Sequence, residues 1–490
     1  MTHRACPPRL VSRWIGRAAV VLLAALGGCA MMEKDSPPLD QRPPSQISLA
    51  RDIQLARDGW PRASWWRSYD DAQLDALVET ALKQAPAMVV ARARVDTARV
   101  QAKGVDASRG VLVGLTATLD RQSISKNGFL GPYGEASPWY SAATVGLGAE
   151  YSVDLWGRDR ARVDAALGVS NARAAEAAQV QLLLSSQIVH VYYDIQSEFA
   201  AQRLLEQARD IEQVLVAAHR ARAERGLQAR TPGELALAHQ LELERQIAAS
   251  QSRIRKLREA LRALLGAGSD DLPDIVAKPL PAASGRLPDT LGYELLARRP
   301  DLQAMRWYVQ ASFDQVDAAK AAFYPSFDIR AFAGFDAIHL GDLLHRPSRQ
   351  LNLIPGLTLP VFDSGRLNAN LASARSQSNL LIAQYNEAIV NAVRDVAQAS
   401  IELEGLQRQM TRQDSQIAAV ESAAGSAEAH YRRGLLDSAA ARQARLPVLV
   451  EQGKALALRT GEIHAQVALV TALGGGYGPE AAAAVAGMAR

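Results

Sequence analysis

Cysteine is almost absent from this chain. Only Cys6 and Cys29 occur among its 490 residues, which excludes a framework of several disulfides and a cysteine-rich metal site. The eight histidines are scattered, and the sequence has no His-Glu-x-x-His pair, phosphate-binding loop or Gly-x-Ser-x-Gly turn. We therefore predict that the protein is not an enzyme, and that it uses no metal and no dissociable cofactor.

Acidic residues are missing from the first 28 positions, which hold four arginines ahead of the apolar run 18–26. That run is too short for a membrane span of about 20 residues, so residues 1–28 are predicted to be a signal peptide. Gly-Gly-Cys at 27–29 resembles a lipoprotein cleavage site, which predicts diacylglycerol and an N-acyl group on Cys29; an ordinary signal peptide is the alternative. The remaining chain has equal numbers of basic and acidic residues, so its charge gives no reason to expect nucleic-acid binding.

Long apolar runs are also missing after the signal peptide. Four segments instead alternate apolar and polar residues over about ten positions, as a transmembrane β-strand requires. They are 111–119, about 141–153, 326–337 and 351–361. The stretch between the members of each pair is polar and contains glycine and proline, which predicts two long-looped hairpins. A half-buried soluble sheet is the alternative.

Proline is missing from about Arg158 to Arg225, where Gly168 is the only glycine. Apolar residues recur there at 4-3-4 spacing (Leu184, Ile188, Val191 and Ile195), which predicts a supercoiling helix about 100 Å long. The stretch 366–433 repeats this pattern. A break and a second helix follow each long helix, and we expect Thr231 to be the N-cap after the first break.

The two halves of the chain share one order of elements, and Gly157-Arg158 returns as Gly365-Arg366. We therefore predict an internal tandem duplication. The predicted parts are a signal peptide (1–28), a flexible lipid-anchored N-terminal tether (29–60), a first repeat (61–270, hairpin about 111–153, long helices 158–265), a linker (271–290), a second repeat (291–473, hairpin about 326–361, long helices 366–473) and a C-terminal tail (474–490).

A sheet that spans a membrane must close, because an open edge in lipid leaves backbone groups unpaired. Four strands cannot close, and a barrel with a passage favours three or more copies of the chain. The alternation assigns apolar side chains to lipid, and it assigns Glu150, Asp328, Arg330 and Thr358 to the lumen.

Six stretches carry a family resemblance: WWRSYDDAQLDALVETAL, YSVDLWGRDRARV, RRPDLQAMRW, AAKAAFYPSFDIRAFAGF, LTLPVFDSGRLNANL and HYRRGLLDS. As an ordered set they resemble the outer membrane factors of tripartite efflux pumps (TolC/OprM-like channels), in the NodT-type lipoprotein branch. The resemblance implies an α+β membrane protein that forms a homotrimer. Its 12-stranded transmembrane β-barrel, with four strands per chain, would continue into a long α-helical coiled-coil barrel.

The resemblance also implies a function and partners. The protein would be a passive exit duct in the outer membrane of a Gram-negative bacterium, extending into the periplasm. It would pass small molecules from an inner-membrane RND-type pump and a periplasmic adaptor (membrane fusion) protein, with outer-membrane lipid around it. A protein-secretion duct and a periplasmic coiled-coil scaffold lipoprotein are the alternatives.

The strand–helix junctions are the first candidate site. We expect Gly157 to supply an unusual backbone conformation, Arg158 to pair with Asp154 or with lipid head groups, and Trp156 to suit the interfacial aromatic belt. Ser364 occupies the position in the second repeat that Trp156 occupies in the first, so we expect Trp156 to be dispensable. Gly110 would replace Pro325 at the start of the first hairpin. The candidate junction residues are Asp154, Gly157, Arg158, Pro325, Pro360, Asp363, Gly365 and Arg366.

The periplasmic tip is the second candidate site, with the residues Gly226, Glu234, Gly434, Asp437, Arg442, Gln443 and Arg445. In the family, acidic residues follow the glycine that corresponds to Gly434, and an acidic ring favours cations. Asp437 matches that pattern, but Gln443 stands where a second aspartate is expected, with Arg442 and Arg445 beside it. These arginines would favour anions or change the gating; alternatively they face outward, in solvated pairs or adaptor contacts.

Overall fold

The computed structural model describes residues 32–33, 37–42, 56–57, 60–123, 125, 139–268, 271–282, 286–287, 295 and 297–478. The predicted signal peptide and Cys29 lie outside these residues, as does the end of the predicted tail. Among the described residues, no helix is both long and apolar enough to cross a membrane.

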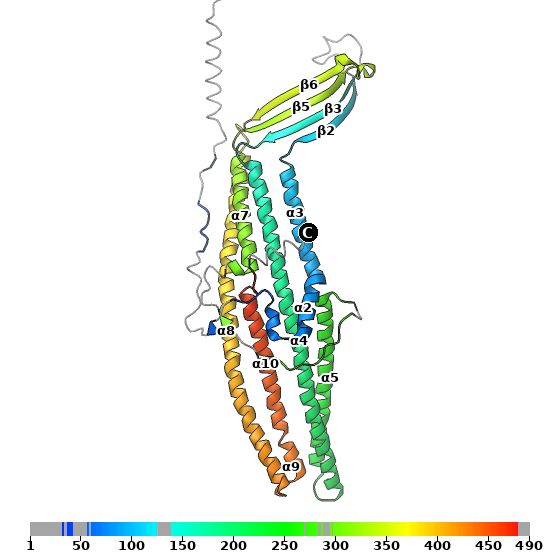
Figure 1. The fold of residues 1–490 in the computed structure, drawn as a ribbon, viewed down its shortest axis with the longest axis vertical. Helices are drawn as coiled ribbons and strands as arrows, with labels where there is room; N and C mark the ends of the chain where they lie inside the picture. The colour runs from blue at the N-terminus through cyan, green and yellow to red at the C-terminus, as the bar shows by residue number, and fades with distance from the viewer. Residues whose placement is uncertain are drawn as a thin grey trace, which may run out of the picture. The chain divides into compact units, whose positions relative to one another are not determined.

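Four antiparallel strands form one sheet in the order β2-β3-β5-β6 (Figure 1). The strands are β2 (Leu112–Gln122), β3 (Tyr140–Val153), β5 (Ser326–Ala337) and β6 (Arg349–Thr358). The four predicted strands and two predicted hairpins are confirmed, and pairing of β3 with β5 joins the hairpins. The last strand ends before the predicted position 361, close to Pro360, which has no backbone N–H to donate.

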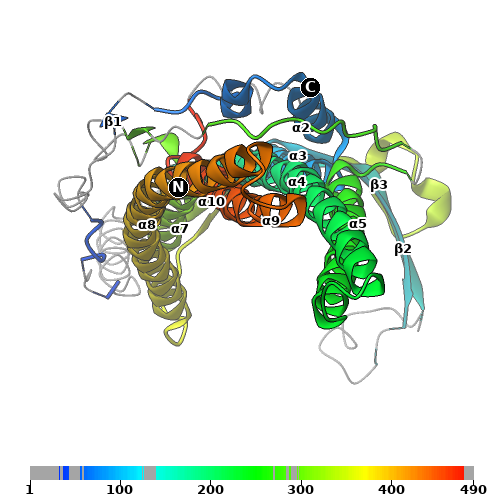
Figure 2. The same ribbon diagram turned by 90° about the horizontal axis from the view of Figure 1, so that it is seen from below.

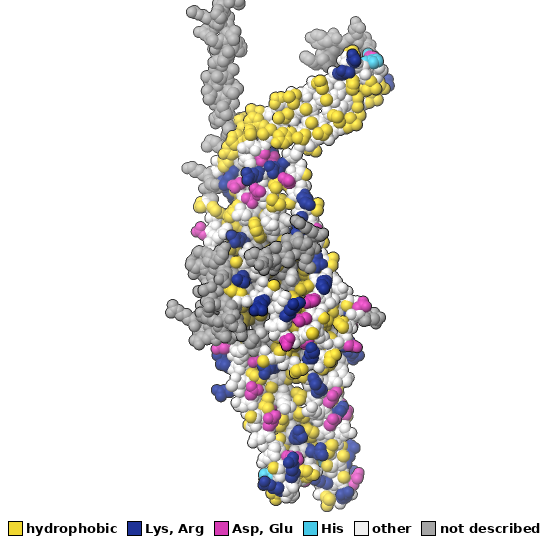
Figure 3. All heavy atoms as spheres, viewed as in Figure 1, with side chains coloured by type: hydrophobic (Ala, Val, Ile, Leu, Met, Phe, Trp, Pro, Cys, Tyr) yellow, Lys and Arg dark blue, Asp and Glu magenta, His cyan; other side chains and the backbone are white. Residues whose placement is uncertain are grey.

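The two faces of the sheet differ in polarity. One face carries apolar side chains, and the visible face of the sheet is covered by them in Figure 3. On the other face Arg330 Nε lies 3.6 Å from Glu150 Oε1 and 3.4 Å from Asp328 Oδ2. Farther along that face, Thr144 Oγ1 donates to Asp336 Oδ2 over 2.6 Å. Period-2 alternation therefore separates an ion-paired face from an apolar one.

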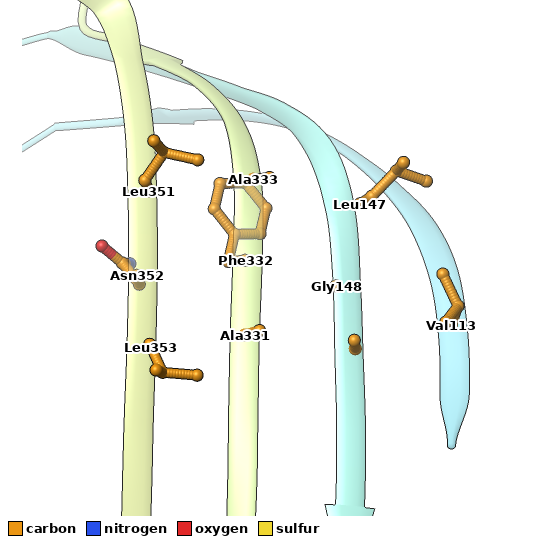
Figure 4. A pocket seen from close by; sticks show the side chains of 10 residues that line it. Val113, Leu147, Gly148, Ala331, Phe332, Ala333, Leu351, Asn352 and Leu353 are labelled. Carbon is orange, nitrogen blue, oxygen red and sulfur yellow. The ribbon is translucent and has the colours of Figure 1, made fainter. Parts of the chain in front are cut away.

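A shallow depression crosses the apolar face (Figure 4). Its floor is low because small side chains, Ala331 and Ala333 on β5, lie at its centre, whereas Leu351 and Leu353 on β6 form one wall. Leu351 is 83% exposed in the single chain. This face consequently offers an uneven and mainly apolar surface, with Asn352 as the one polar residue among those that line the depression.

Helices of equal length recur in the two halves. The helices α3 (Pro86–Ala107) and α7 (Pro300–Ala321) have 22 residues each, and α4 (Arg158–Glu224) and α8 (Arg366–Arg432) have 67 each. These pairs confirm the predicted internal tandem duplication. Other helices in the described residues include η2 (Trp65–Tyr69), α2 (Ala72–Gln84), α5 (Thr231–Leu265), η4 (Leu340–Asp342), η5 (Arg346–Ser348), α9 (Ser438–Gln443) and α10 (Leu446–Ala472).

The chain packs into two compact units, and each draws on both repeats. The first unit comprises residues 1–40, 97–171 and 306–384, and the second comprises 41–96, 172–305 and 385–490. In the first unit, Ser312 on α7 donates to Ser378 on α8 over 3.1 Å, beside a cluster of Val316, Phe323, Leu367 and Leu371. This cluster packs the start of α8 against the end of α7.

In the second unit, segments of α8, α10, α4 and α5 lie side by side in a curved row (Figure 2). Polar contacts join each neighbouring pair: Gln413 with Glu451 (2.8 Å), Thr460 with Ser197 (2.8 Å) and Arg253 with Glu198 (2.7 Å). Three of the four heptad residues predicted for α4 are buried: Leu184, Ile188 and Ile195. They belong to the main hydrophobic core, so the apolar repeat marks the packed side of this helix.

The predicted linker is held against the second unit. Lys278 Nζ lies 2.7 Å from Asp71 Oδ1, and its backbone N–H donates to Gln196 over 2.7 Å. A two-residue parallel pairing between β1 (Ala56–Arg57) and β4 (Arg286–Leu287) was not expected from the sequence. Two residues are too few for any alternation to indicate a strand.

One predicted helix cap is wrong. Thr231 is the first residue of α5, and Arg230, which already has helical dihedral angles (φ −72°, ψ −26°), takes the N-cap position without a side-chain cap. The helix therefore begins one residue earlier than its Thr-Pro-Gly-Glu signature suggests. Glu234 remains in the first turn, where an acidic side chain is favourable to the helix dipole.

Candidate functional site

The first strand–helix junction is organised by an aspartate. Asp154 follows β3, and its Oδ2 accepts a hydrogen bond from the backbone N–H of Arg160 over 2.8 Å. Gly157 has a φ of 73°, in the left-handed region that glycine occupies at little cost. Arg158 begins α4 and contacts its neighbour Asp159 (3.2 Å), rather than Asp154 as one expectation had it. Asp154 thus caps the helix.

The second junction also has an aspartate that caps the following helix, through different backbone N–H groups. Asp363 accepts hydrogen bonds from the N–H groups of Gly365 (3.1 Å) and Leu367 (2.8 Å), at the start of α8. Gly365 has a φ of 85°, and Ser364 before it a φ of 57°. Pro360 lies between β6 and this turn, and Arg366 is the first residue of α8. Capping by an aspartate and a left-handed glycine explain why the motif recurs.

Trp156 connects the two repeats, and this contact was missed in the sequence. Its Nε1 donates to the carbonyl of Pro325 over 2.8 Å, and its ring stacks on Tyr324 with centroids 4.9 Å apart. Ser364 is too short for either contact, so the two junctions are not equivalent. The two motifs alone predict that Trp156 is dispensable. They contain no information on the contacts that this side chain makes with the second repeat.

Gly110 does not take the place of Pro325 at the start of the first hairpin, although the sequence comparison predicted this. The N–H of Gly110 donates to Ala107 over 3.0 Å, as that of Tyr324 donates to Ala321 over 3.2 Å. Gly110 thus corresponds to Tyr324, and Val111 stands in the position of Pro325.

Replacing Gly157 by valine is expected to reduce trimer yield. No atom lies within 4 Å of the position of an added Cβ, so the cost comes from the positive φ alone, about 1–3 kcal/mol for a β-branched residue. Gly157→Asn is the matched control, because asparagine tolerates this conformation. The amount of trimer on a semi-native gel is the measurement, and a normal yield for the valine variant contradicts the expectation.

The two predicted tip turns have the same backbone structure. After α4, Gly226 N–H donates to Ala223 and Leu227 N–H to Arg222, over 3.0 and 2.9 Å. After α8, Gly434 and Leu435 donate in the same pattern, both over 2.9 Å. Both glycines have a φ of 70°, which ends a helix in a tight left-handed turn.

Asp437 is the one acidic residue that matches the family pattern at the tip. Its Oδ1 accepts a hydrogen bond from Ala440 N–H over 2.8 Å at the start of α9, and Arg222 Nη2 lies 3.4 Å from its Oδ2. The Ala440 hydrogen bond, with Arg222 adding to it, holds the pKa of this carboxyl below its usual range. Its charge is therefore already neutralised by an arginine of the other repeat, which was not predicted. Arg442, Gln443 and Arg445 are exposed.

A histidine pair lies between α4 and α10, away from the predicted sites. The rings of His190 and His464 are 4.5 Å apart at 80°, and His464 Nε2 lies 3.0 Å from Asp194 Oδ1. Within the described ranges, no group of three or more such side chains is arranged to hold a metal ion. The pair is instead a candidate for pH sensitivity.

Acid is expected to destabilise the protein through His190. Burial, with His464 adding to it and Asp194 opposing it, lowers the pKa of His190 from 6.5 to about 4. Between these values the unfolded chain binds a proton that the folded chain does not, so this contribution to stability is complete above pH 6.5 and is lost toward pH 4. The loss is about 1–2 kcal/mol per chain at pH 5. Thermal unfolding at pH 7 and 5 should show a smaller difference for His190→Gln than for the parent, and equal differences would refute this role.

Comparisons with known proteins agree with this architecture. Residues 77–267 and 291–475 match the family described as "Outer membrane efflux protein", one segment in each repeat. The chain is 47% identical to the multidrug resistance outer membrane protein MdtP of Shigella flexneri, over 92% of this chain and 94% of that protein. It is 38% identical to MdtQ of Escherichia coli O157:H7, over 94% and 98% of the two chains.

A solved structure also resembles this chain over most of its length. The crystal structure of the outer membrane protein VceC of Vibrio cholerae has a TM-score of 0.76 and 30% identity, covering 85% of this chain and all of that one. This likeness confirms the predicted fold class, a β-barrel to which each chain gives four strands, continuous with a helical barrel. Channels of this family form trimers and work with adaptor and pump partners. The chain belongs to the outer membrane efflux protein family and is, as predicted, an exit duct of the outer membrane rather than an enzyme.

Proposed function

We propose that three copies of this chain close a 12-stranded barrel and pass small, chemically diverse molecules outward, without using energy of their own. The observation that carries the proposal is the four-stranded sheet with one apolar face, whose edge strands β2 and β6 each pair on one side only within the described residues. Open edges are not tolerated in lipid, so β2 of one copy must pair with β6 of the next. The names of MdtP and MdtQ as multidrug resistance proteins support a broad substrate range.

Detergent extraction followed by planar-bilayer recording tests the assembly. We expect a heat-resistant trimer that is released from membranes only by detergent and that conducts ions. A monomer that becomes soluble when Cys29 is removed would instead indicate a scaffold lipoprotein.

Drug susceptibility of a strain lacking the protein tests the cargo. Unchanged susceptibility together with loss of a secreted protein would indicate a secretion duct.

The proposed partners are a periplasmic adaptor and an inner-membrane RND-type pump. The adjacent turns at Gly226 and Gly434 support this part, since they present exposed Leu227 and Leu435 side chains next to arginines. Co-purification of the assembled trimer with an adaptor encoded beside it, and loss of that co-purification on Leu435→Asp, is the expected result.

Covalent diacylglycerol and an N-acyl group on Cys29 are part of the proposal. Cys29 has no disulfide partner after removal of residues 1–28, and Ala30 after it resembles the sorting signal for outer-membrane delivery. Mass spectrometry of the N-terminal peptide should show the added acyl groups. An unmodified Cys29 contradicts the lipid anchor.

The tip is expected to show little cation selectivity or to prefer anions. The turn regions 220–234 and 428–445 each contain four arginines against two acidic residues, and Asp437 is paired with Arg222. Reversal potentials in a salt gradient are the measurement, and the double variant R442Q/R445Q should shift them toward cations. Ordinary cation preference in the parent, unchanged by the double variant, means that these arginines face outward.

A further inference from the structure

The apolar face of the sheet ends in arginines at one end only. On β2, alternate residues from 113 to 119 are apolar and the next on this face is Arg121. On β6, alternate residues from 351 to 357 are apolar and Arg349 precedes them on this face. These arginines are the only charged residues of the four described strands on this face. Both lie at the end remote from α3 and α8, where Figure 3 shows basic side chains beyond the apolar band.

The position of these arginines along the strands explains why they are tolerated on a lipid-facing surface. An arginine on the lipid side of a barrel is strongly destabilising at the middle of a bilayer and nearly neutral close to its surface. The helices at the other end of the sheet extend into the periplasm, so the remote end corresponds to the outer surface of the membrane. This places Arg121 and Arg349 at the level of the head groups of the outer leaflet.

The connection between β5 and β6 adds a third arginine and several apolar side chains. Arg346 begins η5, three residues before Arg349, and is exposed. The exposed apolar side chains of the same connection are Ile338, Leu340 and Leu344. The outer rim of the sheet therefore offers cationic and apolar groups together.

The three rim arginines (Arg121, Arg346 and Arg349) have no carboxylate partner within the part of the chain that the structure describes. Asp342, the acidic residue of the connection, lies 3.5 Å from His345 Nδ1 instead. The guanidinium carbon of Arg121 lies 5.7 Å from the centroid of the Trp139 ring, a contact that leaves its N–H groups able to donate. All three guanidinium groups are exposed and can accept an external anion.

We propose that the rim arginines bind the phosphate groups of the phosphorylated glycolipid of the outer leaflet, lipopolysaccharide. The planar guanidinium fork matches a phosphate group bidentately. The arginines directly continue the lipid-facing apolar face, so a ligand that carries phosphates and acyl chains in one molecule contacts both surfaces. A soluble phosphate ester would leave the apolar part of the rim uncovered.

The site is completed between copies, and in this respect it rests on the proposed trimer. Arg121 and Arg349 lie on opposite edge strands, so β3 and β5 separate them within one chain. When β2 of one copy pairs with β6 of the next, both arginines come to the outer end of the same seam. A lipid with several phosphates can then bridge two copies.

Binding of lipid A, the acylated and phosphorylated part of lipopolysaccharide, to the detergent-solubilised trimer of the full chain tests the proposal. A titration with fluorescently labelled lipid A is expected to saturate in the parent. The triple variant R121A/R346A/R349A should raise the dissociation constant at least tenfold. The matched control R408A/R412A/R432A removes the same charge from exposed positions of α8 and should leave the constant unchanged.

Four results overturn the proposal: no saturable binding by the parent, an unchanged constant in the rim variant, an equal loss in the control, or equal binding of lipid A whose phosphates have been removed. The glutamine variant R121Q/R346Q/R349Q keeps polar side chains, should show the same loss, and serves if the alanine variant fails to assemble. Trimer content and conductance are measured in each preparation. A parent without a trimer refutes the assembly, whereas a conducting trimer with unaffected lipid binding refutes only the role of the rim arginines.

Discussion

Replacing Gly334 by alanine is expected to abolish the heat-resistant trimer. Gly334 on β5 faces Gly146 on β3, in the pairing that joins the two hairpins. A Cβ on Gly334 would lie 2.3 Å from the carbonyl oxygen of Val145 and 2.6 Å from the Cα of Gly146. Both are backbone atoms, so the strands themselves must separate beyond their usual spacing of about 4.8 Å. Phe332 adds to the crowding, since its ring covers both glycines on the same face.

The expected cost of Gly334→Ala is about 3 kcal/mol or more, because several ladder hydrogen bonds weaken together when the strands separate. The matched control is Gly148→Ala, on β3 and on the same face, where an added Cβ meets nothing within 4 Å. The measurement is the temperature at which the trimer dissociates on a gel, with outer-membrane insertion as a second readout. A trimer of normal heat resistance in the Gly334 variant would show that the strands can adjust.

Replacing Arg299 by alanine is expected to destabilise the second unit by about 2–3 kcal/mol. Arg299 is only 8% exposed, yet its guanidinium contacts Asp301 through Nη2 (2.7 Å) and lies 3.7 Å from Asp395. Its Nη1 also donates to the carbonyl of Ala472 at the end of α10, over 3.1 Å. Removing the guanidinium takes this donor from the buried carbonyl of Ala472 and from two half-buried carboxylates, on α7 and α8, of which Asp395 keeps its contact with Arg394. Loss of a donor to such acceptors costs more than the pair contributes when intact.

Thermal unfolding followed by helical circular dichroism measures the effect of Arg299→Ala. Arg306→Ala is the control, because this arginine of the same RRPDLQAMRW motif is exposed. Arg299→Lys should fall between the two, since an ammonium group cannot reproduce the fork that contacts Asp301 through Nε and Nη2. Equal midpoints for the Arg299 and Arg306 alanine variants would show that the buried contacts contribute nothing.

The regular elements could be predicted because their signals are local. Leu184, Ile188 and Ile195 recur at helical spacing, and Leu351, Asn352 and Leu353 alternate at strand spacing, so each stretch of the sequence contains its own evidence. The long helices and the hairpins follow from such patterns. The Asp–Gly–Arg junctions could also be found, because the duplication shows them twice.

The contacts between distant segments could not be predicted. Trp156 meets Pro325 across 169 positions, and Glu33 meets Asn368 across 335. The sequence around one residue of such a pair does not identify the other residue, because a single tryptophan or asparagine forms no periodic pattern. Arg222 beside Asp437 is a similar case: the charge balance of the tip depends on which turns lie together, and the order of residues does not indicate that.

The difference between Trp156 and Ser364 changes the symmetry of the assembled ring. In the proposed trimer, six glycine–arginine junctions follow one another around the circumference, and by that motif alone the ring would have sixfold symmetry. Trp156 is tied to Pro325 in three of them, whereas the other three present a serine hydroxyl. Tryptophan and serine positions therefore alternate around the ring. A ring of partner proteins that contacts these positions and distinguishes tryptophan from serine can bind in three equivalent orientations about the ring axis instead of six.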